Sequence, residues 1–145
     1  MITVHHLENS RSQRVLWMLE ELGLDYEVKL YKREATMQAP TSLRAVHPLG
    51  KSPVITDGDK TLAESGAILE YLVETYGNGR FAPRHGTPER LHYTYFLHYA
   101  EGSLMPLLFM KRAKSPQKLD LRDYYLSTRR AVPAFVPARI PPRCP

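Results

Sequence analysis

The sequence predicts an α/β domain over residues 1–78, in the order βαβαββα, followed by the beginning of an all-helical domain over residues 86–110. Two observations lead to this fold class. Short segments in which apolar and polar residues alternate, as in strands, are followed by longer segments whose apolar residues recur at helical spacing. Glycine and proline separate these segments, as they do where elements end. A strand–helix–strand unit followed by a hairpin and a helix builds one layered core.

The first strand–helix–strand unit is predicted within the first 31 residues. Residues 2–6, ITVHH, alternate weakly and predict a strand. Over residues 11–22 the apolar positions fall on one helical face and glutamates on the other, and Gly23 ends this helix as a C-terminal cap. Residues 26–31, YEVKLY, alternate again and predict the second strand.

The rest of the α/β domain is predicted to hold a short helix, a hairpin and a longer helix. Pro40 and Pro48 confine any helix between them to a short piece. Asp57-Gly58 separates two apolar runs, which is a strong hairpin signal. Residues 65–76 carry apolar side chains on one helical face, and Gly77 is expected to end that helix.

After a linker over residues 77–87, a further helix is predicted to begin at Pro88, because proline suits the first turn of a helix. Gly102 and Pro106 are expected to weaken or bend the helical segment that comes next. An apolar and aromatic stripe at helical spacing is expected to pack between helices, with a ligand-lining role as the alternative; it consists of Leu91, Tyr95, Phe96 and Tyr99.

The charge distribution changes at about residue 110. Residues 1–110 hold 11 Lys/Arg and 13 Asp/Glu, a net charge of −2, whereas residues 111–145 hold 9 and 2, a net charge of +7. Five prolines in residues 132–145 exclude a helix or a central strand there. We therefore expect residues 111–145 to be an atypical basic, Pro-rich tail whose end, over residues 132–145, is irregular or disordered. Basic patches can bind nucleic acid, but this one lacks a recognised motif, so we predict no nucleic-acid partner.

Several classes of protein do not fit this sequence. No segment approaches the roughly 18 uncharged apolar residues of a membrane-spanning helix, and the N-terminus does not resemble a secretory signal. The single cysteine, Cys144, cannot form an internal disulfide, and no Cys/His spacing typical of a metal site is present. His5, His6 and His47 are expected to be structural or surface residues. We expect a cytoplasmic protein without a metal ion or a membrane partner.

Two serines stand where predicted helices begin. Ser10 has Gln13 three residues later, which is the spacing of a capping box. From the residues alone, a plain N-cap and a functional role for Ser10 are equally favoured. Ser65 is expected to cap a helix that begins at Gly66, and such a helix N-terminus is a ready site for a carboxylate.

Three segments within residues 1–77 carry a family pattern: LENSRSQRVLWMLEELG, HPLGKSPVI and LAESGAILEYL. In this order they resemble the first turn, the N-P-x-G-K-V-P-x-L element and the L-x-E-S-x-A-I-x-x-Y-L signature of serine-type glutathione transferases, of bacterial and fungal type. The match extends to about residue 110. The resemblance implies a thioredoxin-like fold for residues 1–78 and a partial, apparently truncated, all-helical domain after it.

The resemblance implies a catalytic role for Ser10, with Ser12 as a second candidate. The Ser10 hydroxyl would donate a hydrogen bond to the sulfur of glutathione, at a helix N-terminus that also favours negative charge. Both effects favour the thiolate, which is the reactive nucleophile. The absence of cysteine at this turn argues against a thioredoxin-like or glutaredoxin-like redox role.

The resemblance also implies five residues that bind glutathione. Pro53 is cis in the family, which lets the residue before it, here Ser52 where valine is more usual, offer its backbone N–H and C=O. Lys51 would reach the glycine carboxylate, Ser65 the γ-glutamyl carboxylate and Glu64 the ammonium group. From the residues alone, Pro53 could instead be a trans proline that opens an edge strand, and Lys51 and Glu64 could be solvated charges.

By resemblance, the protein is an enzyme that conjugates glutathione to electrophilic small molecules in detoxification, as a cytoplasmic homodimer. Glutathione would be a substrate, and no further cofactor is implied. Two other interpretations remain: a non-catalytic binding or interaction module with the same fold, and an inactive truncated fragment. The segment RRAVPAFVPARIPPRCP, which resembles nothing in the family's helical domain, favours the last.

Overall fold

A computed structural model describes residues 1–114, with side chains described for residues 1–110. The chain divides into two compact units after Met105, and the α/β domain lies in the first. The predicted basic tail lies outside the described residues, apart from the backbone of residues 111–114, which is helical. Cys144 lies outside them as well.

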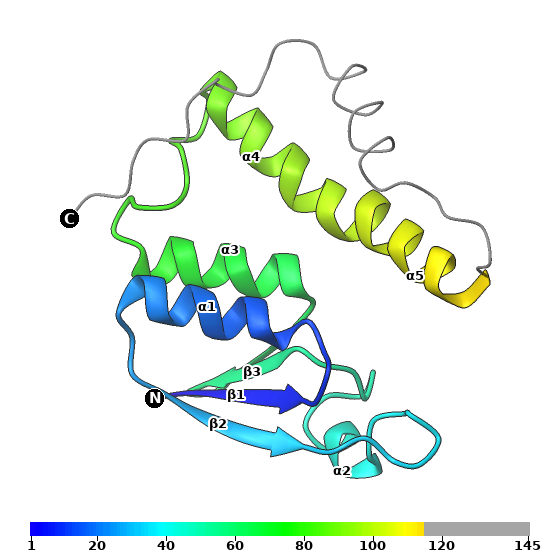
Figure 1. Ribbon diagram of the computed structural model, residues 1–145. Coiled ribbons are helices and arrows are strands. Elements are labelled where there is room, and N and C mark those ends of the chain that lie inside the picture. Colours follow the sequence, from blue (N-terminus) through cyan, green and yellow to red (C-terminus); the bar gives the residue numbers. More distant parts are fainter. Residues whose placement is uncertain (115–145) are drawn as a thin grey trace. The chain divides into compact units, whose positions relative to one another are not determined.

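The α/β domain has the predicted order of elements, so the predicted fold class is confirmed (Figure 1). Its elements are β1 Ile2–Leu7, α1 Ser12–Leu22, β2 Tyr26–Tyr31, α2 Thr41–Arg44, β3 Val54–Asp57, β4 Lys60–Ala63 and α3 Ser65–Tyr76. Three helical elements come after α3: α4 Pro88–Tyr99, the π-helix η1 Ala100–Leu104 and α5 Met105–Lys114. No helix within residues 1–114 combines the length and the apolar character needed to cross a membrane.

The four strands form one mixed sheet in the order β2-β1-β3-β4. β1 pairs with β2 in parallel and with β3 antiparallel, and β3 pairs antiparallel with β4. Val54, the first residue of β3, lies opposite His5 of β1 and Ala63 of β4. The end of β1, the beginning of β3 and the end of β4 therefore meet at one edge of the sheet.

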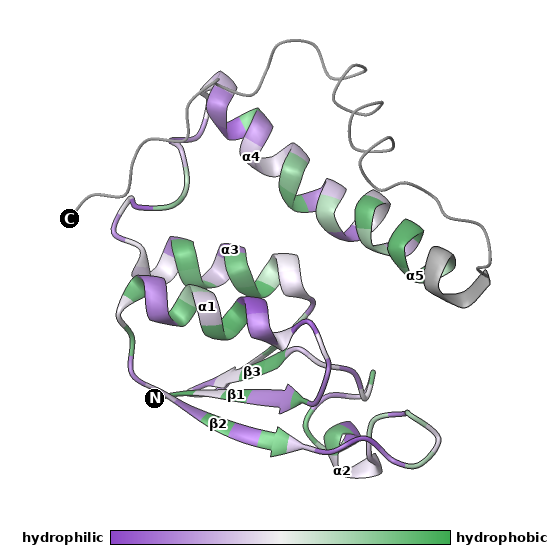
Figure 2. Ribbon diagram, viewed as in Figure 1, coloured by the Kyte–Doolittle hydropathy of each residue, from purple (hydrophilic) through white to green (hydrophobic). Residues whose placement is uncertain are grey.

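The main core lies between the sheet and the helices α1 and α3, which lie side by side on one face of the sheet (Figure 1). Both helices carry hydrophobic residues at regular intervals among hydrophilic ones (Figure 2), as the sequence predicts. The buried residues of this core are Ile2, Val4, Val15, Met18, Leu19, Leu22, Ile55, Ile68, Leu72 and Val73. Helical spacing alone therefore identified the faces of α1 and α3 that are buried.

A smaller core lies around Leu7, Tyr31 and Leu43, the last of which is contributed by α2. Next to it, His5 is buried and its Nδ1 lies 3.0 Å from the hydroxyl oxygen of Tyr31. Burial lowers the pKa of His5, and the positive charge of Lys29 lowers it further. His5 is thus a structural residue, one of the two roles that the sequence analysis left open for it.

The two predicted turns that depend on glycine are confirmed. Gly23 ends α1 in the left-handed conformation, with φ at 69°, and its N–H donates to the carbonyl of Glu20. Gly58 has φ at 59° in the two-residue turn that joins β3 to β4. Both positions have a positive φ that a side chain with a Cβ rarely adopts.

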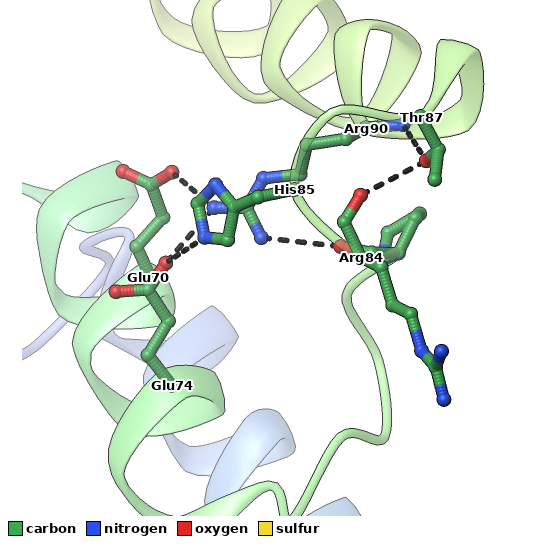
Figure 3. A network of polar contacts seen from close by, with 7 residues as sticks. Glu70, Glu74, Arg84, His85, Thr87 and Arg90 are labelled. Carbon is green, nitrogen blue, oxygen red and sulfur yellow. Dashed lines mark hydrogen bonds and ion pairs between the residues drawn. The ribbon is translucent and has the colours of Figure 1, made fainter.

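The predicted start of α4 is confirmed as well. Pro88 occupies the first turn, and the Thr87 side chain accepts the N–H of Arg90 at 3.3 Å. The guanidinium of Arg90 lies 2.8 Å from a carboxylate oxygen of Glu74 and 3.8 Å from one of Glu70 (Figure 3). Because only 12% of the Arg90 side chain is exposed, these contacts attach the beginning of α4 to α3.

The aromatic rings of α4 pack on one another along the helix. Tyr95 stacks on Tyr99, with 5.9 Å between ring centroids, and meets Phe96 edge to face. Leu91, Tyr95 and Phe96 nevertheless stay exposed. Beyond Tyr99 the helix departs from α geometry at η1, as expected for this region, because Pro106 has no N–H to donate to a carbonyl one turn earlier.

Asp57 joins the β3–β4 hairpin to α3. Its carboxylate accepts a hydrogen bond from Tyr76 and a second one, 2.8 Å long, from Tyr71. The hydrogen bond from Tyr76 is the main reason that the pKa of Asp57 lies below its usual value. A carboxylate with a lowered pKa stabilises the folded state above its unfolded pKa, and this contribution disappears as the pH falls through the folded value.

We expect Asp57→Asn to lower the free energy of unfolding by about 1–3 kcal/mol at pH 7, the usual effect of weakening hydrogen bonds to a charged group. The difference from the wild type should shrink below about pH 4, near the usual pKa of aspartate. Urea unfolding at pH 7 and at pH 3 measures both. Asp59→Asn, in the adjacent turn with a 93% exposed side chain, is the control. Equal effects of the two substitutions at pH 7 would contradict the expectation.

Candidate functional site

The register of the sheet brings three separate segments to one edge. Ser10 follows the end of β1, Pro53 precedes the beginning of β3, and Glu64 follows the end of β4. The helices α1 and α3 both begin at this edge, so their free N–H groups gather there. The predicted site residues therefore belong to one region, although up to 55 positions separate them in the sequence.

Ser10 lies at the centre of a group of hydroxyls. Its Oγ is 2.6 Å from Oγ of Ser12 and 3.2 Å from Oγ of Ser52, and it accepts the N–H of Ser12 at 3.3 Å. Ser10 is half-buried, whereas no part of Ser12 is exposed. Ser12 is therefore closed to a ligand, whereas Ser10 keeps part of its surface exposed.

Ser10 is not the N-cap of α1, which was one of the two roles that the residues alone left open for it. Helix α1 begins at Ser12, and its N-cap residue is Arg11, which makes no capping hydrogen bond with its side chain. Gln13 is exposed. The physical reason is that the Ser10 hydroxyl is engaged by Ser12 and Ser52, and that it lies one residue too early to be the N-cap.

Ser52 is attached to the end of β1. Its hydroxyl donates to the carbonyl of His5 at 2.9 Å and accepts the N–H of Leu7 at 3.3 Å. The peptide bond between Ser52 and Pro53 is cis, the form that the family resemblance implies, and Pro53 is buried. Lys51 stands immediately before them and is exposed.

Glu64 and Ser65 mark the beginning of α3. The helix spans Ser65–Tyr76, the range predicted from its apolar face, but its N-cap residue is Glu64 and not Ser65, which was expected to cap it. Glu64 is exposed and has φ at 74° and ψ at 124°, a conformation that costs a residue other than glycine about 1–3 kcal/mol. Ser65 is buried, with 4% of its surface exposed. Such strain is typical of functional sites, where the surrounding structure holds the backbone in place.

Two features at this edge escaped the sequence analysis. Glu101, in η1, forms ion pairs with Arg11, the N-cap residue of α1, at 3.1 Å, and with Arg14 in the first turn of that helix. His6 is half-buried, and its Nδ1 lies 2.8 Å from Oγ of Ser12. No local pattern could have indicated the Glu101 pairs, because 87 positions separate Arg14 from Glu101. Within residues 1–110, no group of three acidic, His or Cys side chains could hold a metal ion.

Comparison with a protein-family model gives a match over residues 1–74, to the glutathione S-transferase N-terminal domain. Glutathione S-transferase 3 of Schizosaccharomyces pombe is 45% identical over 109 residues, which cover 75% of this chain and 45% of that protein. Glutathione S-transferase 1 of Saccharomyces cerevisiae is 38% identical over 117 residues, which cover 77% and 50%. This chain thus spans about half the length of these curated relatives.

Solved structures show the same likeness. A glutathione S-transferase from Actinobacillus pleuropneumoniae superposes with a TM-score of 0.70 at 41% identity, covering 90% of this chain and 60% of that one. A glutathione transferase homologue from Lodderomyces elongisporus, solved with two glutathione molecules per subunit, has a TM-score of 0.67 at 26% identity, covering 89% and 65%. Both share the fold of this chain.

Proposed function

This chain belongs to the glutathione S-transferase family, and we propose that it binds glutathione at the edge where β1, β3 and β4 meet and transfers the thiolate to an electrophilic small molecule. The observation that carries the proposal is the hydroxyl of half-buried Ser10, 3.2 Å from Oγ of Ser52, beside the N-terminus of α1. In the reaction, the thiol proton leaves to solvent and the sulfur forms a bond to an electrophilic carbon. In a substitution the bond from that carbon to its leaving group breaks and the group departs with the electron pair; in an addition to an activated double bond the π electrons move to the neighbouring atom, which takes up a proton from solvent.

Ser10 would make the sulfur reactive. A free cysteine thiol has a pKa of about 8.5, so that only a few per cent is ionised at pH 7. A hydrogen bond donated by the Ser10 hydroxyl favours the charged form, and so does the partial positive charge at the beginning of α1. The thiolate then attacks from a fixed position, which replaces an encounter in solution.

The other segments at this edge would bind the ends of the tripeptide. Ser52, before the cis proline, would offer its backbone N–H and C=O to the cysteinyl part. The N-terminus of α3, at Ser65, suits the γ-glutamyl carboxylate because its N–H groups have no partner within the helix. Exposed Glu64 would face the ammonium group, and exposed Lys51 would reach the glycine carboxylate. Glutathione would act as a substrate, not as a cofactor.

The proposal includes the setting that the family implies. The protein would act in the cytoplasm, in the detoxification of electrophiles, as a homodimer. The exposed apolar side chains of α4, Leu91, Tyr95 and Phe96, are compatible with association, since large apolar patches on a surface commonly mark interfaces. Sedimentation of the full chain, with and without glutathione, measures the oligomeric state.

We expect Ser65→Ala to weaken glutathione binding about tenfold, because a hydrogen bond to a charged carboxylate is worth roughly 1.5–3 kcal/mol. Calorimetric titration of the full chain measures the dissociation constant. Thr75→Ala, an exposed position near the other end of the same helix, is the control and should bind as the wild type does. Equal affinities of the two variants for glutathione would show that the Ser65 hydroxyl at the beginning of α3 does not bind it. Wild-type binding without turnover on any electrophile would instead support a non-catalytic module.

A further inference from the structure

A continuous chain of polar side chains leads away from Ser10 into the interior. Oγ of Ser10 lies 2.6 Å from Oγ of Ser12, which lies 2.8 Å from Nδ1 of His6. Ser12 has no exposed surface, so water does not compete for its hydroxyl. In a setting of low dielectric, such hydrogen bonds polarise one another. The direction in which this chain donates therefore affects the Ser10 hydroxyl directly.

The direction is limited by the number of protons. Each serine hydroxyl has one proton to donate and two lone pairs that accept. The proton of Ser52 is donated to the carbonyl of His5 at 2.9 Å, so Ser52 cannot also donate to Ser10. The hydroxyl of Ser10 also accepts the N–H of Ser12. In its 3.2 Å contact with Ser10, Ser52 can therefore only accept, so the proton of Ser10 can go to Ser52, to Ser12 or to a ligand.

The role of His6 Nδ1 decides between two arrangements. If Nδ1 carries no proton, Ser12 donates to it, and Ser10 must donate to Ser12 to complete the contact of 2.6 Å. The proton of Ser10 is then donated to Ser12 and cannot be donated to a ligand. If Nδ1 carries a proton, His6 donates to Ser12 and Ser12 donates to Ser10. The proton of Ser10 then no longer goes to Ser12, so that Ser10 can donate it to Ser52 or to a ligand. The Ser10 oxygen is polarised by the donor behind it.

We propose that His6 is a positioning residue that acts through Ser12: its Nδ1–H sets the direction of the hydroxyl chain, so that Ser10 donates its proton towards the substrate sulfur. This inference rests on the proposed function, because it takes Ser10 as the donor to the thiolate. His6 does not touch the substrate. It prevents Ser10 from donating its proton to Ser12, so that Ser52 and the ligand are the two acceptors left for that proton.

The test uses the full chain with glutathione bound. The ultraviolet absorbance of the thiolate, titrated against pH, gives the pKa of the bound thiol. In His6→Leu we expect this pKa to rise by about one unit, and kcat/KM near pH 7 to fall about tenfold, the equivalent of one pKa unit. The loss should disappear at high pH, where the thiol ionises without help. A fold-wide structural effect would instead lower activity at every pH.

His6→Asn is the matched control, since its side-chain amide can donate from near the position of Nδ1. We expect this variant to retain the wild-type thiol pKa and most of the activity. In the Ser10→Ala background, His6→Leu should cause no further loss, because the two residues act as one unit. Thermal unfolding of each variant checks that it is folded. The ¹⁵N chemical shifts of His6 report directly whether Nδ1 carries a proton.

The outcomes separate this inference from the proposed function. A lowered thiol pKa in the wild type that persists in His6→Leu would overturn the role of His6 alone. An Nδ1 without a proton in the glutathione complex would do the same, and so would independent, additive losses for His6→Leu and Ser10→Ala. If the thiol of the wild-type complex has the same pKa as free glutathione, both the proposed function and the proposed role of His6 are overturned.

Discussion

Ser10→Ala is expected to lower kcat/KM for glutathione conjugation about 10- to 150-fold near pH 7. A hydrogen bond donated to a charged group is worth roughly 1.5–3 kcal/mol, and each 1.36 kcal/mol of transition-state stabilisation corresponds to about a factor of ten. Ser10 is half-buried next to Ser52, which is also half-buried but donates its proton to the carbonyl of His5, and next to Ser12, which has no exposed surface. Removing the Ser10 hydroxyl leaves the thiolate supported mainly by the beginning of α1.

The pH dependence identifies the cause of that loss. If Ser10 stabilises the thiolate, the pKa of the bound thiol rises in Ser10→Ala towards the value of about 8.5 for a free thiol. Activity then recovers as the pH is raised beyond it. Steady-state kinetics from pH 6 to pH 10 measure this recovery. Ser42→Ala, at an exposed position in α2, is the matched control and should keep the wild-type profile. A Ser10→Ala variant with unchanged kcat/KM at pH 7 would refute the role of this hydroxyl.

Leu72→Ala is expected to lower the free energy of unfolding by about 2–5 kcal/mol, the usual cost of removing a large apolar side chain from a core. Leu72 lies in α3 with no exposed surface, in the core that α1 and α3 form with the sheet. Because domains are stable by only about 5–15 kcal/mol in total, this single change removes a large part of the stability.

The same substitution at an exposed leucine provides the comparison. Leu91, in α4, is 73% exposed, and Leu91→Ala should change the free energy of unfolding by no more than about 0.5 kcal/mol. Urea unfolding followed by circular dichroism measures both. Since α3 also carries Ser65 at its beginning, Leu72→Ala should lose glutathione binding at urea concentrations that leave Leu91→Ala folded. Similar midpoints for the two variants would show that α3 does not pack against the sheet through Leu72.

The sequence by itself determined the order of the elements and the faces that they bury. Residues such as Val15, Leu19, Ile68 and Leu72 recur at helical spacing, and that spacing alone defines the apolar side of a helix. The hairpin turn at Asp57-Gly58 and the end of α1 at Gly23 were also predicted from the sequence. These features depend on neighbours a few positions apart, so local sequence contains the information.

The N-cap residues of α1 and α3 were not predicted correctly. Ser10 and Ser65 have the composition of N-cap residues, yet the N-cap positions belong to Arg11 and Glu64. Cap preferences are worth about 1 kcal/mol, and contacts made by the rest of the fold outweigh a preference of that size. At Ser10 these contacts are the hydrogen bonds with Ser12 and Ser52.

Only the tertiary structure decided which side chains meet at the site. The family resemblance pointed to Ser10, Ser52 and Ser65, but it did not show that Ser10 is partly exposed while Ser12 is buried, or that His6 lies behind them both. Nor did it place Glu101 against the first turn of α1. Periodicity in a sequence reports which face of an element is buried. Contacts between residues 40 to 90 positions apart depend on strand register and helix packing, which the folded chain alone sets.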